Sequence, residues 1–438
     1  DYSGLAADVK AAFAGITTQT GKITLTDALV SVTDINTVAG VTSGEVTATV
    51  TSAAASVLKT LTTTSTDAIT MTVNVEAASA ATLAADLVSL NGKTNQVITM
   101  TAVTKVSGSY ADLLNVYVTN AGQYNGEGDE AVTITGTVSA TEADAIADVT
   151  SGVVTAASIT ADTASALNSA LSDAQVNAYT LTISAGSAAA TDLTSLDSKT
   201  SVAVNAAAVT AISGSATEVA AAYAANTATT ISGLGNENVT ITGTTVATLA
   251  ELKAINNATS GTLTLNAQSI SADYSGLVVD VKDAFAGITT QTGKITLTDT
   301  SVSVADINAV APVTSGVVTA TITSGAASVL KALTTTSTDA ITMTVNAEAA
   351  SAATAAGDLV SLNGNTNQII TMTAVSSVSG SYADLLDIYV TNKTQYTGIG
   401  DETVTIVGTV SATQADAIAD ATSGIVTAAT ITADTAAA

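Results

Sequence analysis

The chain has 438 residues, a formal net charge of −26 and no His, Cys, Arg or Trp. Without His or Cys it lacks the commonest general base, the thiol nucleophile and the usual zinc ligands, and without Arg it cannot clamp phosphate through two parallel hydrogen bonds. We therefore expect a protein that is not an enzyme and does not bind nucleic acid, because phosphate backbones are neutralised by Lys and Arg.

Short stretches in which an apolar residue alternates with Thr recur along the chain and predict β-strands. Most of them start 21 to 30 residues apart. In the first 272 residues the starts are Ile23, Val46, Ile69, Ile98, Val132, Val153, Tyr179, Val202, Val239 and Thr262. No run of about eighteen apolar residues interrupts this pattern, so we expect no membrane span.

Segments between these strands carry the signals of short helices. Three of them align without gaps: Ser31–Gly44, Ser139–Gly152 and Thr248–Gly261. Each opens with Ser or Thr and has Asp or Glu three residues later, which is the pattern of a capping box. Each closes with Thr-Ser-Gly, and we expect the glycine to be the left-handed residue that ends the helix. The aligned Val38, Ile146 and Ile255 are expected to face the core.

The chain repeats itself over a long period. Residues 273–438 match residues 1–166 at a constant offset of 272, with 134 of the 166 positions identical. We predict one full period of about ten turns in residues 1–272 and a partial period of about six turns in 273–438, continuous with the first. Because the repeat is interrupted at both ends, we expect the chain to be part of a longer array.

Strands joined by helices imply a parallel sheet with helical crossovers. The sequence therefore predicts an α/β solenoid, in which strand–short helix turns stack into one parallel sheet as in leucine-rich repeats. The alternative is an all-β parallel β-helix, in which the Ala-rich segments are loops.

A glycine-rich loop before three of the strands is the main candidate site. It reads GEGDE (Gly126–Glu130), GLGNE (Gly233–Glu237) and GIGDE (Gly398–Glu402). Adjacent carboxylates and glycine carbonyls suit a hard cation, so Asp129, Glu130, Asp401 and Glu402 are candidate calcium ligands, and calcium is the only cofactor considered. The alternative is a tight glycine turn with solvated acids, since the loops lack the D-x-D-x-D-G pattern.

The Thr-x-Thr stretches are a second candidate. Thr24 and Thr26, Thr47 and Thr49, and their counterparts are expected to stack into two columns on one sheet face. Such arrays resemble the ice-binding faces of β-solenoid antifreeze proteins. They favour an adhesin or ice-binding module as the alternative function.

Phrases such as SATEADAIADVTSGVVTAASITADTASAL (residues 139–167) resemble the repeat regions of giant secreted cyanobacterial cell-surface proteins, of the swimming-motility type of marine Synechococcus. The resemblance implies an extracellular, cell-surface location and supplies no functional residues. The leading hypothesis is a structural protein that forms or decorates a filament, fibre or surface layer. Its expected partners are other copies of itself, end to end or side by side, and surface glycans.

Overall fold

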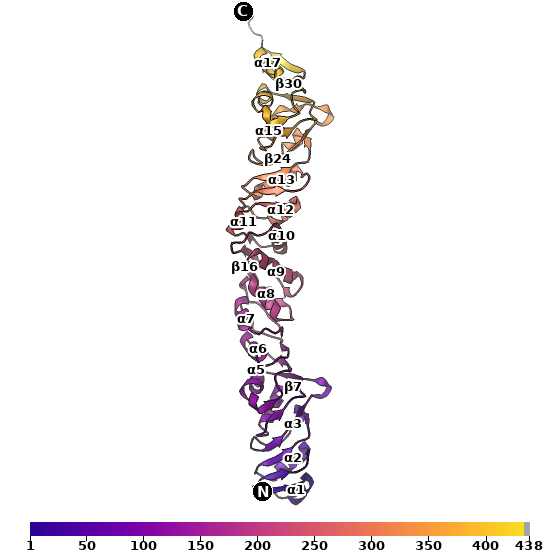
Figure 1. Cartoon of the computed structure of the whole chain (residues 1–438), viewed down its shortest axis with the longest axis vertical. Coiled ribbons are helices and arrows are strands. Elements are labelled where there is room, and N and C mark those ends of the chain that lie inside the picture. Colours follow the sequence, from indigo (N-terminus) through magenta and orange to yellow (C-terminus); the bar gives the residue numbers. More distant parts are fainter. Residues whose placement is uncertain (433–438) are drawn as a thin grey trace, which may run out of the picture. The chain divides into compact units, whose positions relative to one another are not determined.

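The computed structural model describes residues 1–432, in which strands and short helices alternate along the chain (Figure 1). Contacts divide the chain into two compact units. Unit 1 is Asp1–Ile212 with Ala221–Leu234, and unit 2 is Ser213–Ala220 with the residues from Gly235 onward. The strand β16 (Val209–Gly214) and the helix α9 (Ala216–Thr227) contribute residues to both. The units therefore do not coincide with the sequence period, which restarts at Asp273.

Unit 1 consists of short helices and strands. Its helices are α1 (Ala6–Ala12), α2 (Val32–Ala39), α3 (Ala55–Leu58), α4 (Ala84–Asn91), α5 (Tyr110–Leu114), α6 (Ala140–Ala147), α7 (Ala164–Ala170) and α8 (Ala190–Lys199), with the single turns η1 (Ala77–Ser79), η2 (Asn115–Thr119) and η3 (Ala121–Gln123). Its strands are β1 (Tyr2–Gly4), β2 (Ile23–Leu25), β3 (Val46–Thr49), β4 (Ala53–Ala54), β5 (Ala68–Thr70), β6 (Val73–Asn74), β7 (Thr82–Leu83), β8 (Ile98–Thr99), β9 (Lys105–Gly108), β10 (Tyr124–Asn125), β11 (Ala131–Ile134), β12 (Val154–Ala156), β13 (Ala178–Tyr179), β14 (Gly186–Ala189), β15 (Val204–Asn205) and β17 (Ile231–Ser232).

Unit 2 repeats the same alternation. Its helices are α10 (Leu249–Ala258), α11 (Ala267–Ser271), α12 (Val278–Ala284), α13 (Val304–Val310), α14 (Ala327–Leu330), α15 (Ala356–Asn363), α16 (Tyr382–Leu386) and α17 (Ala412–Ala419), with η4 (Ala311–Val313), η5 (Ala349–Ser351), η6 (Asp387–Thr391) and η7 (Lys393–Gln395). Its strands are β18 (Asn238–Ile241), β19 (Leu263–Thr264), β20 (Tyr274–Gly276), β21 (Ile295–Leu297), β22 (Val318–Thr321), β23 (Gly325–Ala326), β24 (Ala340–Thr342), β25 (Val345–Asn346), β26 (Thr354–Ala355), β27 (Ile370–Thr371), β28 (Ser377–Gly380), β29 (Tyr396–Thr397), β30 (Thr403–Val410) and β31 (Val426–Ile431).

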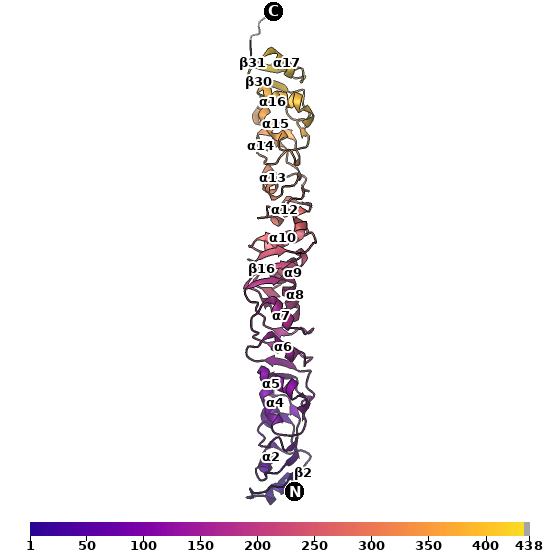
Figure 2. The same cartoon turned by 90° about the vertical axis from the view of Figure 1, so that its left-hand side faces the viewer.

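Strands of successive turns pair in parallel. In unit 1, Ile23 of β2 lies between Tyr2 of β1 and Val46 of β3. In unit 2 the same register recurs 272 residues later, with Ile295 of β21 between Tyr274 of β20 and Val318 of β22. Within each unit the helices follow one another in chain order from turn to turn (Figure 2). This confirms an α/β repeat architecture of parallel strand–helix units.

The core is built by the apolar residues that alternate with Thr. Ile23, Val46 and Ile69 are almost fully buried on successive strands, and Ile35 and Val38 of α2 cover them without any exposed area. Burying one such side chain contributes about 1.5–3 kcal/mol. Ile146 and Ile255, the counterparts of Val38, are equally buried, as predicted.

Helix starts follow the sequence signals. Ser139 and Thr248 form complete capping boxes with Glu142 and Glu251, and the Ser31 hydroxyl accepts the Asp34 N–H. The Ala-rich segments are therefore helical.

The predicted helix ends are wrong. α2 and α6 each end five residues before their glycines, Gly44 and Gly152, and α10 ends three residues before Gly261; none of these glycines has a positive φ. Instead, these glycines let the backbones of two neighbouring turns approach each other closely.

The sheet also differs from the prediction of one strand per turn. The strands form several short parallel sheets, because many turns contribute two strands. β9 was not predicted, since Lys105–Gly108 contains only one buried apolar residue, Val106. It is a strand because β7 and β11 pair with it on either side.

Candidate functional site

The glycine loop connects strands that belong to two different sheets. GEGDE leads from β10, the last strand of its sheet, into β11 of the next sheet, and GIGDE leads from β29 into β30 in the same way. Gly126 and Gly128 have φ values of +85° and +105°. A Cβ on Gly126 would also lie 2.9 Å from the Thr101 backbone nitrogen. Glycine is thus required here by both φ and space.

The last residue of the loop, a glutamate, points into the core. Glu130 and Glu237 have no exposed area and Glu402 has 1%. The Glu130 carboxylate accepts the Gly128 N–H at 2.8 Å and the Tyr117 hydroxyl at 3.2 Å, and Glu402 accepts the same bonds from Gly400 and Tyr389. In the middle loop, Glu237 accepts the Gly235 N–H.

Burial raises the pKa of Glu130 above its usual value, because removing the carboxylate from water disfavours its charged form; the bond from Gly128 offsets this in part. Burial also raises the pKa of Tyr117, and the neighbouring Glu130 adds to the effect. The second oxygens of Glu130 and Glu402 are buried without a hydrogen-bond partner. The glutamates therefore hold the loop closed at an electrostatic cost.

The four predicted calcium ligands do not converge. Asp129 and Asp401 are exposed, whereas Glu130 and Glu402 next to them are turned inward. Across residues 1–432, no group of three or more Asp, Glu, His or Cys side chains is placed to hold a metal ion. Calcium binding stays a prediction, and the structure gives the two glutamates a packing role in the loop.

The Thr-Ser-Gly segment of the next turn docks on this loop. The Thr150 hydroxyl donates to the Glu130 carbonyl at 2.9 Å and accepts the Gly152 N–H at 3.1 Å. The Ser151 N–H donates to the Gly128 carbonyl at 2.8 Å. A Cβ on Gly152 would overlap the Glu130 carbonyl, at a distance below the 3.0 Å that real Cβ atoms respect. The glycine is needed because two backbones meet here.

We call this arrangement the turn junction: a buried or partly buried Thr, a Ser N–H and a Gly of one turn contact the backbone of the preceding turn. In unit 2 it recurs with Thr259 on the Glu237 carbonyl at 2.8 Å and with Thr422 on the Glu402 carbonyl at 3.5 Å. Turns without a glycine loop use it as well, with Thr42 on Gly21 and Thr314 on Gly293. Sequence reasoning identified both motifs but missed that they form one contact.

Ion pairs add a second link between turns. Each joins a Lys to an acid of the next turn, and the lysines are half-exposed. The pairs are Lys10–Asp34, Lys22–Glu45, Lys59–Asp86, Lys253–Asp280, Lys253–Asp283, Lys282–Asp306 and Lys331–Asp358. Exposed pairs of this kind contribute only about 0.2–1 kcal/mol each. They add a weak link between neighbouring turns.

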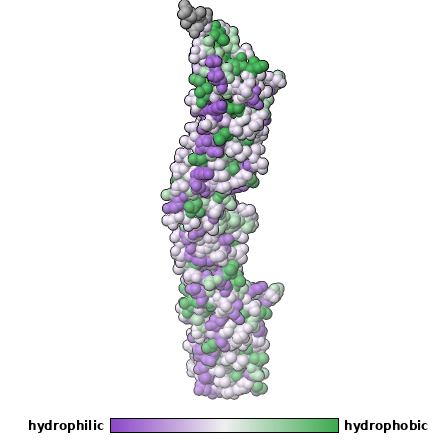
Figure 3. Space-filling model, turned by 45° about the horizontal axis from the view of Figure 1, so that its top comes forward, coloured by the Kyte–Doolittle hydropathy of each residue, from purple (hydrophilic) through white to green (hydrophobic). Residues whose placement is uncertain are grey.

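The predicted threonine columns are wrong. Thr24 pairs with Thr47, but Thr47 then pairs with Ala68, and Thr70 pairs with Thr49 instead. The register slips by two residues because the buried Ala48 and Ile69 set the pairing between β3 and β5. The threonines align only in short runs, such as Thr24 with Thr47 and Thr49 with Thr70, and not in continuous columns. On the face seen in Figure 3, apolar residues lie in small separate patches.

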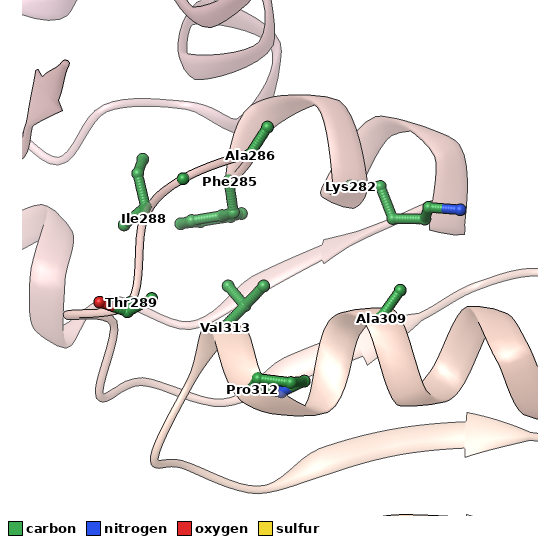
Figure 4. Close-up of a pocket in the computed structure, with 9 residues that line it drawn as sticks. Lys282, Phe285, Ala286, Ile288, Thr289, Ala309, Pro312 and Val313 are labelled. Carbon is green, nitrogen blue, oxygen red and sulfur yellow. The ribbon is translucent and has the colours of Figure 1, made fainter.

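A hollow of about 290 Å³ opens beside α12 and η4. Figure 4 shows Phe285 and Val313 turned toward each other, with Lys282 at one side. The Lys282 amine is bound to Asp306 at 3.0 Å, so the lining is apolar apart from Thr289. The arrangement offers surface for a contact and no pair of groups for acid–base chemistry.

No helix in residues 1–432 is long and apolar enough to cross a membrane. No protein-family model matches the sequence, and no curated protein is significantly similar to it.

Proposed function

We propose that the chain is a non-catalytic structural repeat protein, an α/β solenoid of the leucine-rich-repeat kind that forms or decorates a filament, fibre or surface layer. The observation that carries the proposal is the identical turn junction 272 residues apart, Thr150 on Glu130 and Thr422 on Glu402, each with a buried glutamate and tyrosine beneath it. A protein whose turns bind their neighbours through one repeated backbone contact is suited to extension.

Charge and composition support a location outside the cell. The net charge of −26 keeps a large surface soluble and attracts cations. The absence of Cys, together with stability that comes from stacked turns, is compatible with an exposed position. The resemblance of the repeat phrases to giant secreted cyanobacterial surface proteins points the same way, and we propose that type of protein as the relative.

Electron microscopy of cells that produce the chain tests this function. Antibody labelling on the outer surface, with long uniform fibres or a lattice in negatively stained material, is the expected result. Labelling confined to the cell interior, or only short monodisperse particles in the released material, would contradict it.

A further inference from the structure

A lysine, an asparagine and an aspartate of two successive turns meet beside the end of α7, within unit 1. The Lys199 amine donates to the side-chain oxygen of Asn168 at 2.9 Å. The Asn168 side-chain nitrogen donates to the Asp192 carboxylate at 3.0 Å, and the Ser195 hydroxyl donates to the Asn168 side-chain oxygen at 2.7 Å. A primary amine therefore lies against a carboxamide whose oxygen and nitrogen are both held by other groups.

The helix α8 positions the three groups around the carboxamide. Asp192, Ser195 and Lys199 follow one another on α8 at spacings of three and four residues, so they share one face of the helix, and α8 packs on α7. The Lys199 amine also donates to the Asn168 backbone carbonyl at 2.8 Å and to the Leu171 carbonyl at the end of α7. These bonds hold the amine beside Asn168.

The corresponding contact in an earlier turn is an ion pair. In a gapless alignment of α8 with α4, Asp192 corresponds to Asp86, which binds the Lys59 amine at 2.9 Å. The other lysine amines that form side-chain hydrogen bonds in the described part of the chain also bind Asp or Glu. Asn168 takes the place of Lys59, and the amine comes from Lys199 instead. A carboxamide differs from a carboxylate because an amine can displace its nitrogen as ammonia.

We propose that Lys199 and Asn168 become joined by an isopeptide bond, a covalent link between successive turns. The Lys199 nitrogen loses a proton to solvent and attacks Cγ of Asn168. The Ser195 hydroxyl stabilises the negative charge that develops on the Asn168 side-chain oxygen, and Asp192 takes a proton from the attacking amine and passes it to the leaving nitrogen. The Nζ–Cγ bond forms, the Cγ–Nδ2 bond breaks, and one ammonia leaves, with no oxidation or reduction.

Such a bond supplies a covalent staple that the chain otherwise lacks. The chain has no Cys, so it contains no disulfides. A cross-link stabilises a fold mainly by restricting the unfolded chain, and this one ties α7 to α8. The modification goes beyond the proposed structural role and does not depend on it.

Mass spectrometry of the purified full chain tests the bond. Incubation in mildly alkaline buffer increases the fraction of neutral lysine amine. A protease that cleaves after Asp and Glu leaves Asn168 and Lys199 in separate peptides, residues 163–173 and 198–218. The expected product is one branched peptide that contains both, with a mass lower than their sum by one ammonia.

Three variants separate the bond from other losses of ammonia. K199R keeps the charge and the donors but has no nucleophilic amine, so it should give no branched peptide. D192N keeps both reacting residues and should slow the formation of the branched peptide by at least about 100-fold. D86N makes the same change at the Lys59 ion pair and should leave the rate unchanged. Circular dichroism checks that each variant is folded.

The wild-type chain alone decides the main point. Absence of the branched peptide after prolonged incubation would overturn the proposal, even if ammonia is lost, because Asn168 can also cyclise onto its own backbone. A branched peptide that forms as fast in folded D192N as in D86N would overturn the role of Asp192. Neither result changes the evidence for the structural role.

Discussion

Replacing Gly152 by Ala perturbs the turn junction most directly. The added Cβ would overlap the Glu130 carbonyl, so the two backbones must separate. Overpacking of this kind costs about 1–3 kcal/mol. Separation also weakens the bonds from Thr150 to the Glu130 carbonyl, at 2.9 Å, and from Ser151 to the Gly128 carbonyl, at 2.8 Å. Each is worth about 0.5–1.5 kcal/mol, so we expect a total loss of about 2–6 kcal/mol in the free energy of unfolding.

Urea unfolding followed by circular dichroism measures this loss, and Gly122→Ala is the matched control. Gly122 has a negative φ and no atom within 4 Å of an added Cβ. Its replacement should be neutral or stabilising by up to about 1 kcal/mol, because Ala restricts the unfolded chain. The reasoning is refuted if G152A unfolds within about 0.5 kcal/mol of G122A, a difference typical of surface substitutions.

Four further predictions concern the same junction and the two sequence-derived sites. Thr150→Val leaves the Glu130 carbonyl without its donor and the Gly152 N–H without its acceptor. It should lower the free energy of unfolding in urea by about 1–3 kcal/mol. The control Thr133→Val, at an exposed strand position, should lower it little. Burial raises the pKa of Glu130 above its ordinary value near 4.5, so the charged carboxylate destabilises the folded state at any pH above the raised pKa. This destabilisation disappears as the pH falls toward 4.5 and the carboxylate becomes protonated. Tm should therefore rise on mild acidification, and E130Q should flatten that part of the Tm–pH profile. The loop geometry argues against the calcium site predicted from the sequence: because Asp129 is exposed and Glu130 is buried, millimolar calcium should leave Tm unchanged. A calcium-dependent rise in Tm that D129N abolishes would instead establish the metal site. The broken threonine columns predict no thermal hysteresis at high protein concentration, and measurable hysteresis lost in T47V would favour the ice-binding alternative.

Local signals were sufficient to predict the strand–helix alternation. The Thr-apolar pattern marked β2, β3 and β5, and the capping boxes marked α6 and α10, because each depends on residues within one turn of the chain.

Contacts between turns could not be read in the same way. Gly152 looked like a helix end, yet its requirement comes from the Glu130 backbone more than twenty residues away. The shift in register between β3 and β5 depends on which buried residues pair, so the prediction of continuous Thr columns was wrong.

The burial of Glu130 also contradicts the usual exposure of glutamate. One signal was present: Glu ends all three glycine loops, while the second residue varies as Glu127, Leu234 and Ile399. The sequence analysis interpreted these glutamates as calcium ligands or solvated acids, whereas a constant acid beside a variable neighbour is the signal that could have pointed to a packing role.

Hydrogen exchange of the full chain, read by mass spectrometry, measures the turn junction most directly. The amides of Ser151, Ser260 and Ser423 donate to the Gly128, Gly235 and Gly400 carbonyls of the preceding turns. They should be protected to a similar degree, and G152A should accelerate exchange only in the turns next to it. Exchange at these amides as fast as in exposed loops would contradict an array held together by this repeated contact.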